Sequence, residues 1–298
     1  MSPITNGHAL EFYYDISCPF AYIASTKIEA LAARTNAQLI YRPVLLGAIY
    51  RATSAPQGAA GSASDVFNAT KKAVSSRAFQ RTIKRHGIEH KEPLRHPQKT
   101  TGALRLLYCI DDQAARAKLT RALFRAYWVE GKDVSSKATL INTLYAASIP
   151  GAMALIKMVE DGSFEGEEQR RELETATDQA VKRGTPGVPG FYVPDADRLW
   201  WGQDRMHFVE SALLALNEGR ISDDIGSIST RLQSLIPRSS HHDGIPPGQN
   251  IKLQFWYDFS SPWAFLGWTQ LARLRRQFGS RLEIEMKPFL LGILFREM

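Results

Sequence analysis

The chain has 298 residues, of which 44% are hydrophobic, enough to bury the core of one large domain or of two ordinary ones. No apolar run reaches the length of a membrane span, and residues 1–6 carry neither a hydrophobic signal core nor an arginine-rich transit pattern. The chain end at Met298 does not form a peroxisomal signal. We therefore expect a cytoplasmic protein, with neither a mitochondrial nor a peroxisomal address and with no membrane partner.

The formal net charge is +7, and much of the excess falls within residues 71–99. This stretch lacks interleaved aromatic residues and any nucleic-acid-binding motif, so we expect a solvated helical face and no nucleic-acid partner. A small acidic ligand would also benefit from the positive field. The two cysteines, Cys18 and Cys109, cannot form a disulfide framework. No pair of cysteines or histidines has the spacing of zinc ligands, so we expect no metal.

The first part of the chain has the pattern of a βαβ unit. Residues 9–15 favour a strand, residues 18–34 carry apolar residues at helical spacing, and residues 38–44 favour a second strand. The two strands complete a βαβ unit if they are parallel. A loop rich in glycine, alanine and serine follows over residues 53–64, and a loop beside a site can carry ligand contacts.

Cys18 lies between the first strand and the first helix. Pro19 suits the first position of a helix, which places Cys18 at the amino end. Unpaired amides and the helix dipole favour negative charge there, and a thiol in such a place is acidified. We therefore expect Cys18 to be a reactive thiol of lowered pKa. Cys109 lies in a helical pattern and is expected to be a packed core thiol.

The middle and the end of this α/β region differ in pattern. Residues 63–183 are helical almost throughout, which is too long for one crossover helix and indicates a helical subdomain inserted into an α/β core. Residues 191–193 and 198–201 then form a predicted β-hairpin around a polar turn. A final helix is expected to follow Gly202. The fold class is thus α/β.

The last part of the chain repeats the first. Residues 219–250 are polar and contain a Gly-Ile-Pro-Pro-Gly sequence, which is typical of a linker. Residues 253–264 then align with residues 10–21 at a constant offset of 243, and the offset becomes 245 after a two-residue insertion. Ser261 stands where the first copy has Cys18. We expect residues 251–298 to be a truncated βαβ repeat that contributes no independent catalysis and is marginally stable unless docked.

The motif at residues 15–21, Asp-Ile-Ser-Cys-Pro-Phe-Ala, resembles the active-site motif of kappa-class glutathione transferases and 2-hydroxychromene-2-carboxylate isomerases. These proteins have a thioredoxin fold and are related to the DsbA disulfide oxidoreductases. The resemblance covers residues 8–218 and implies one DsbA-like thioredoxin-fold domain with a helical insert. The family usually has a serine at the position of Cys18, which makes Cys18 the expected catalytic residue here.

The resemblance also implies a glutathione site. The Val188-Pro189 bond is expected to be cis and to face Cys18, because a cis-proline turn in this fold pairs with the cysteinyl unit of glutathione. Gln203 and Asp204 align with family residues that contact the γ-glutamyl end of the tripeptide. The other expected contacts are Pro19 and Phe20 of the motif and Ser54, which is nearest in position to an asparagine of the family.

The implied function is that of a glutathione-dependent transferase or isomerase. Glutathione would be the co-substrate of a small electrophilic or aromatic compound, and a homodimer is one assembly that we consider. Because Cys18 can form a mixed disulfide with glutathione, a glutathione-linked thiol–disulfide oxidoreductase is an alternative. No cysteine stands three residues after Cys18 to resolve a disulfide. A second alternative is a catalytically inactive thioredoxin-fold binding module.

Overall fold

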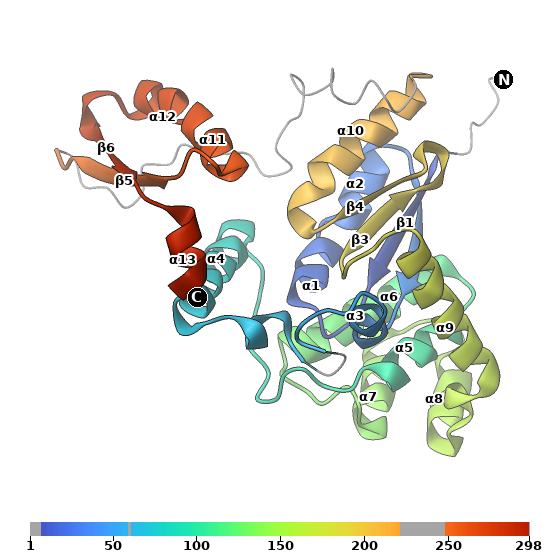
Figure 1. Cartoon of the computed structure of the whole chain (residues 1–298). Helices are drawn as coiled ribbons and strands as arrows, with labels where there is room; N and C mark the ends of the chain where they lie inside the picture. The colour runs from blue at the N-terminus through green and yellow to red at the C-terminus, as the bar shows by residue number, and fades with distance from the viewer. Residues whose placement is uncertain (1–6, 59–60, 221–247, 298) are drawn as a thin grey trace. The chain divides into compact units, whose positions relative to one another are not determined.

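The computed structural model describes residues 7–58, 61–220 and 248–297 (Figure 1). The chain divides into two compact units, Met1–Pro237 and Arg238–Met298. Most of the linker expected over residues 219–250 lies outside the described residues, as do residues 1–6, for which we expect no targeting signal. Within the described residues, no helix is both long and apolar enough to cross a bilayer.

The first unit is organised around a four-stranded sheet with the order β2-β1-β3-β4. Its strands are β1 (Ala9–Tyr14), β2 (Gln38–Pro43), β3 (Gly190–Val193) and β4 (Arg198–Trp201). β1 and β2 are parallel, whereas β3 is antiparallel to both β1 and β4. The predicted βαβ unit and the predicted hairpin are therefore both confirmed.

Side chains that alternate along β1 form the core on one face of the sheet. Phe12 is fully buried and lies opposite Tyr41 of β2 and Phe191 of β3. Its ring stacks on that of Phe191 at 5.6 Å and on that of Tyr14 at 5.0 Å. Aromatic contacts of this kind add to the stabilisation that burial provides.

The predicted helix over residues 18–34 is wrong in one respect, because the structure has two helices there. They are α1 (Pro19–Ser25) and α2 (Ile28–Arg34). At the junction, the hydroxyl groups of Ser25 and Thr26 donate hydrogen bonds to the carbonyls of Tyr22 and Ile23. Such side-chain bonds compete with the helical backbone bonds and favour an end at this point.

The inserted helical subdomain is confirmed. The helices between β2 and β3 are α3 (Leu46–Ala52), α4 (Ala69–His86), α5 (Thr101–Tyr108), α6 (Gln113–Trp128), α7 (Lys137–Ala147), α8 (Ala152–Asp161) and α9 (Glu167–Lys182). The 3₁₀ turns η1 (Ala63–Val66) and η2 (Ser163–Glu165) accompany them. Most side chains of α4 are exposed, and this helix carries much of the expected basic face.

The helices cover both faces of the sheet. α6 covers the face that carries Tyr14, since the ring of Phe124 lies 5.8 Å from that of Tyr14. On the other face, Arg183, which follows α9, binds Glu11 of β1. After β4, the 3₁₀ turn η4 (Gln203–Arg205) leads into α10 (Met206–Asn217). α10 lies beside α2 (Figure 1), where Glu210 accepts a hydrogen bond of 2.7 Å from Arg34.

The second unit is a βαβ unit with a parallel two-stranded sheet. Its elements are β5 (Ile251–Tyr257), α11 (Pro262–Thr269), α12 (Leu271–Phe278), the 3₁₀ turn η6 (Gly279–Arg281), β6 (Leu282–Pro288) and α13 (Leu291–Glu297). The order of elements is that of β1 to α3, as the repeat predicts. Ser261 lies directly before α11, as Cys18 lies directly before α1.

The buried indole of Trp128 gives a test of how α6 is fixed to the sheet. Its Nε1 donates a hydrogen bond of 2.8 Å to the carbonyl of Ile16. A Trp128→Phe variant removes this bond and leaves a void, so we expect a loss of about 2 kcal/mol or more in the free energy of unfolding. The melting temperature of the variant should fall by about 4 °C or more.

The matched control is Trp201→Phe, because Trp201 is 54% exposed. Thermal melts followed by circular dichroism would compare both variants with the parent chain. Equal melting temperatures for Trp128→Phe and Trp201→Phe would contradict this account.

Candidate active site

Cys18 faces the turn that precedes β3. It occupies the N-cap position of α1 in an extended backbone conformation, and Pro19 is the first residue of the helix. Its Sγ donates a hydrogen bond of 3.2 Å to the carbonyl of Val188. The Val188-Pro189 bond is cis, as predicted. The structure thus brings together two segments that are 170 residues apart in the chain.

The carboxylate of Asp15 fixes the turn that carries Cys18. Asp15 Oδ1 accepts hydrogen bonds from the amide and hydroxyl groups of Ser17, each at 3.0 Å. Oδ1 also accepts one from Thr100 at 2.8 Å, and Oδ2 accepts one from the amide of Leu46 at 3.0 Å. Because Asp15 is fully buried, desolvation raises the pKa of its carboxyl despite these bonds.

The expected acidification of Cys18 is wrong for this structure. Only 6% of the residue is exposed, and burial raises the pKa of its thiol to about 12. The amides of Phe20 and Ala21 act in the opposite direction but are outweighed, and the nearby carboxylate of Asp15 adds a smaller upward contribution. Cys18 is therefore a neutral thiol at pH 7, and its S–H group is available as a donor.

Tyr50 and Trp201 lie beside the cis-proline turn, and our sequence reasoning did not find them. A Cβ atom added to Gly187 would lie 3.3 Å from Trp201 Nε1 and 3.7 Å from Tyr50 Cε1. Both rings therefore approach the backbone of this turn closely. Burial, with a smaller contribution from the nearby Cys18, raises the pKa of Tyr50 to about 12, so its hydroxyl remains protonated at neutral pH. No motif or periodicity in the sequence indicates that these two rings lie beside the turn.

Lys27 is a second residue that our sequence reasoning missed. Its Nζ donates a hydrogen bond of 2.9 Å to Oε1 of Gln203. Burial lowers the pKa of Lys27 to about 8, although the carboxylate of Asp204 favours the charged form. Asp204 also pairs with Arg205 at 2.7 Å. Lys27, which lies between α1 and α2, thus binds Gln203 and interacts electrostatically with Asp204, the two predicted residues of η4.

The other predicted ligand contacts differ in their surroundings. Phe20 is 46% exposed, and its ring meets that of Phe79 edge-on at 5.8 Å. Ser54 is exposed in the turn after α3 and has a positive φ of 52°. Among the described residues, no hydrogen bond joins the Ser54 side chain to Cys18, Gln203 or Asp204. Its role in a ligand site stays a prediction.

Cys109 lies apart from these groups, at the carboxyl end of α5. It is only partly buried, and its Sγ lies 3.7 Å from the carbonyl of Arg105. Burial raises the pKa of its thiol to about 11. The expectation of a packed thiol therefore holds only in part.

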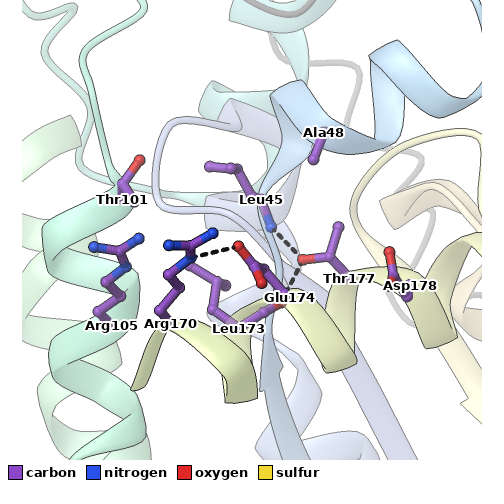
Figure 2. Close-up of a pocket in the computed structure, with 9 residues that line it drawn as sticks. All are labelled: Leu45, Ala48, Thr101, Arg105, Arg170, Leu173, Glu174, Thr177 and Asp178. Atoms are coloured by element: carbon purple, nitrogen blue, oxygen red, sulfur yellow. Dashed lines mark hydrogen bonds and ion pairs between the residues drawn. The ribbon is translucent and has the colours of Figure 1, made fainter. Parts of the chain in front are cut away.

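A small cavity of about 100 Å³ lies between α3, α5 and α9 (Figure 2). Arg105, Arg170 and Glu174 line it, and Arg170 pairs with Glu174 at 2.9 Å. Pockets that bind ligands of drug size are about 300 Å³ or larger, so this cavity is too small for glutathione. It contains none of the predicted site residues, and we assign the candidate active site to Cys18 and the cis-proline turn.

Comparison with known proteins gives the family and the fold of this chain. A family model described as "DSBA-like thioredoxin domain" matches residues 9–214. A 2-hydroxychromene-2-carboxylate isomerase of Sphingobium xenophagum is 29% identical over 208 residues, which are 69% of this chain and 97% of that protein. An isomerase of the same name from Pseudomonas putida is 22% identical, over 68% of this chain and 93% of that protein.

Two solved structures show the same fold. One is a 2-hydroxychromene-2-carboxylate isomerase with a TM-score of 0.59 and 20% identity, matched over 76% of this chain and 100% of that chain. The other is a probable DsbA oxidoreductase of Streptomyces coelicolor with a TM-score of 0.53 and 16% identity, matched over 71% and 90%. The predicted thioredoxin-like fold with a helical insert is confirmed.

The raised pKa of Cys18 predicts how its reactivity depends on pH. We expect the rate of alkylation by iodoacetamide to be low at pH 7 and to rise about tenfold per pH unit beyond pH 9, because only the thiolate reacts. Mass spectrometry of labelled peptides would give the rate for each cysteine. The rate for Cys18 in the chain unfolded with urea is the reference for a free thiol. The rate for Cys109 in the folded chain is an internal reference. A rate that levels off below pH 9 would restore the acidified thiol that the sequence predicts.

Proposed function

We propose that this chain, which belongs to the family of DsbA-like thioredoxin domains, is a glutathione-dependent isomerase or transferase that acts on small aromatic or electrophilic compounds. The relatives named 2-hydroxychromene-2-carboxylate isomerase support an isomerase. The observation that carries the proposal is the contact between Cys18 Sγ and the Val188 carbonyl at 3.2 Å. The residue at the catalytic position of the motif thus faces the backbone that would bind an extended tripeptide.

Cys18 would act as a neutral hydrogen-bond donor. With a pKa of about 12, its thiol keeps its proton at neutral pH. When glutathione binds, this S–H group would turn from the Val188 carbonyl to the sulfur of glutathione. A donor at that place stabilises the glutathione thiolate, which is the nucleophile. A thiol donates more weakly than a hydroxyl, so Cys18 performs the role less well than a serine would.

Charged side chains would hold the γ-glutamyl end of glutathione. The carboxylate of Asp204 suits the ammonium group of the ligand, and it would exchange part of its present contact with Arg205 at 2.7 Å. The ammonium of Lys27, which now binds Gln203, suits the α-carboxylate. Opposite charges that meet in this way fix the orientation of the ligand as well as its affinity.

The bound thiolate would then react with the second substrate. In isomerisation, the sulfur adds to an electrophilic carbon, the adduct rotates about the bond that has become single, and the same carbon–sulfur bond breaks to release glutathione. In transfer, the carbon–sulfur bond persists and the leaving group departs with the electron pair. The neutral hydroxyl of Tyr50, whose ring approaches the cis-proline turn, would donate a hydrogen bond to an oxygen of the substrate.

Thiol–disulfide exchange is the second candidate, and the free thiol of Cys18 favours it. In that reaction a Cys18 thiolate attacks a glutathione mixed disulfide, the new sulfur–sulfur bond forms, and the other thiolate leaves. The raised pKa of Cys18 opposes this chemistry because it keeps the thiolate population small.

Substitution of Cys18 separates the two candidates. Cys18→Ser should keep or increase glutathione-dependent isomerisation of 2-hydroxychromene-2-carboxylate, because a hydroxyl is the stronger donor. Cys18→Ala should reduce kcat/KM about 10- to 100-fold, since it removes one hydrogen bond to a charged sulfur. The absorbance change of the substrate, with and without glutathione, would measure both effects.

Cys109→Ser is the matched control, and its activity should equal that of the parent chain. If Cys18→Ser loses isomerisation while the parent chain reduces a glutathione mixed disulfide, the exchange reaction is the function. Activity that does not depend on glutathione would contradict the proposal.

Lys27 gives the glutathione site a dependence on pH. Its ammonium is present below its pKa of about 8 and is lost as the pH rises through that value. We therefore expect the affinity for glutathione to fall above pH 8 in the parent chain. Lys27→Met should raise Kd about tenfold at pH 7, and this difference should shrink at pH 9.

Isothermal titration calorimetry at several pH values would measure these affinities. Because glutathione itself titrates in this range, the informative quantity is the difference between the two profiles. Lys157→Met, at an exposed lysine of α8, is the control and should follow the parent chain. A constant ratio of Kd values across this range would exclude Lys27 as a charged contact.

A further inference from the structure

The second unit has an apolar groove beside β5. The groove has a volume of about 400 Å³, and its lining includes Phe255, Tyr257, Phe265, Trp268 and Met286. Phe265 is 62% exposed and Trp268 is 55% exposed. Aromatic surface of this extent, gathered in one place, is typical of an interaction site.

The internal repeat identifies the same surface in the first unit. Residues that line the groove have counterparts there at the offset of 243. Among them, Tyr257 corresponds to Tyr14, Phe259 to Ile16 and Phe265 to Tyr22. The counterparts Tyr14 and Ile16 are fully buried, and Tyr22 is 8% exposed. In the second unit Phe259 is 93% exposed. The surface that is buried in the first unit is therefore exposed at the corresponding place in the second unit.

One helix provides this cover in the first unit. The ring of Phe124 in α6 lies 5.8 Å from that of Tyr14 and 5.9 Å from that of Tyr22. Trp128, one turn further along α6, donates its hydrogen bond to the carbonyl of Ile16. The space that α6 fills in the first unit is thus the counterpart of the groove in the second.

We propose that the groove of the second unit binds an amphipathic helix of another protein in the manner in which α6 covers β1. An aromatic side chain at the place of Phe124 would lie between Tyr257 and Phe265. Apolar side chains of a helix that enter a groove are a common mode of recognition between proteins. The aromatic lining of the groove is of the residue type that dominates such interfaces.

The charges around the groove indicate which kind of helix would bind there. In the first unit, Arg121 of α6 pairs with Glu29 of α2. The counterpart of Glu29 is Ala272, and α12 contains no acidic residue but three exposed arginines, Arg273, Arg275 and Arg276. A basic residue at the place of Arg121 would therefore meet like charge. The partner helix is expected to be acidic at this position.

A peptide derived from α6 tests this proposal on the full chain. The peptide has the sequence of residues 112–129, which keeps the N-cap Asp112, with the change Arg121→Glu and a fluorescent label. We expect saturable binding in fluorescence anisotropy, about fivefold tighter than that of the peptide with Arg121. The protein variant Trp268→Glu should weaken binding about 30-fold or more.

Two controls make the result specific. Met153→Glu changes a side chain that is 66% exposed in the first unit, and it should leave binding unchanged. A Phe124→Glu form of the peptide should not bind. Because Trp268 is exposed, its substitution leaves the fold intact, and circular dichroism would check this.

Three outcomes would overturn the proposal. One is equal binding by Trp268→Glu and the parent chain. A second is no binding by the parent chain, which would mean that the groove is filled or does not accept a helix. The third is sedimentation of the parent chain with phosphatidylcholine vesicles, lost in Trp268→Glu, together with no binding of the peptide, which would make the aromatic surface a membrane contact.

Discussion

The buried carboxylate of Asp15 is the interaction on which the candidate site depends. A carboxylate without water must have its acceptor positions filled by the protein, and here the donors come from three separate segments. These are the turn after β1, the start of α3 and the residue before α5. Because one side chain joins them, the position of Cys18 is set by the sheet and by the helical insert together. A change in any of these segments would move the thiol.

The exclusion of water also decides the protonation state of the Cys18 thiol. Cys18 lies in a place where amides point toward its sulfur, yet the exclusion of water outweighs them. The charged groups lie instead near the start of α10, where Lys27 and Asp204 interact electrostatically. The site therefore separates two tasks, with a neutral donor at the reacting sulfur and ionic groups at the far end of the ligand. This division suits a reaction in which glutathione itself carries the negative charge.

What the residue patterns themselves predict is local, whereas the approach of the Val188-Pro189 turn to Cys18 was predicted only through the family resemblance. The motif at residues 15–21 indicates a strand, a turn and a helix within a few residues, and the hairpin after Pro189 has equally local signals. The burial of Cys18 could not be predicted in this way, because it depends on a turn that contains Val188. The role of Lys27 was missed for the same reason, since its partner Gln203 is remote in sequence. The break after Thr26, by contrast, has a local cause in neighbouring hydroxyl groups.

The arrangement around Asp15 occurs twice in the chain. Asp258 accepts hydrogen bonds from Ser260 at 2.8 Å and from the amide of Leu291 at 2.7 Å, which are the counterparts of Ser17 and Leu46. Those bonds lower the pKa of Asp258, which is only partly buried, whereas desolvation raises the pKa of Asp15. One polypeptide thus holds these bonds in two dielectric environments, and Asp15 accepts one more, from Thr100, that has no counterpart at Asp258 among the described residues. During acidification the buried copy gains its proton first although it accepts the additional bond, so at Asp15 the removal of water outweighs the hydrogen bonds that favour the charged form.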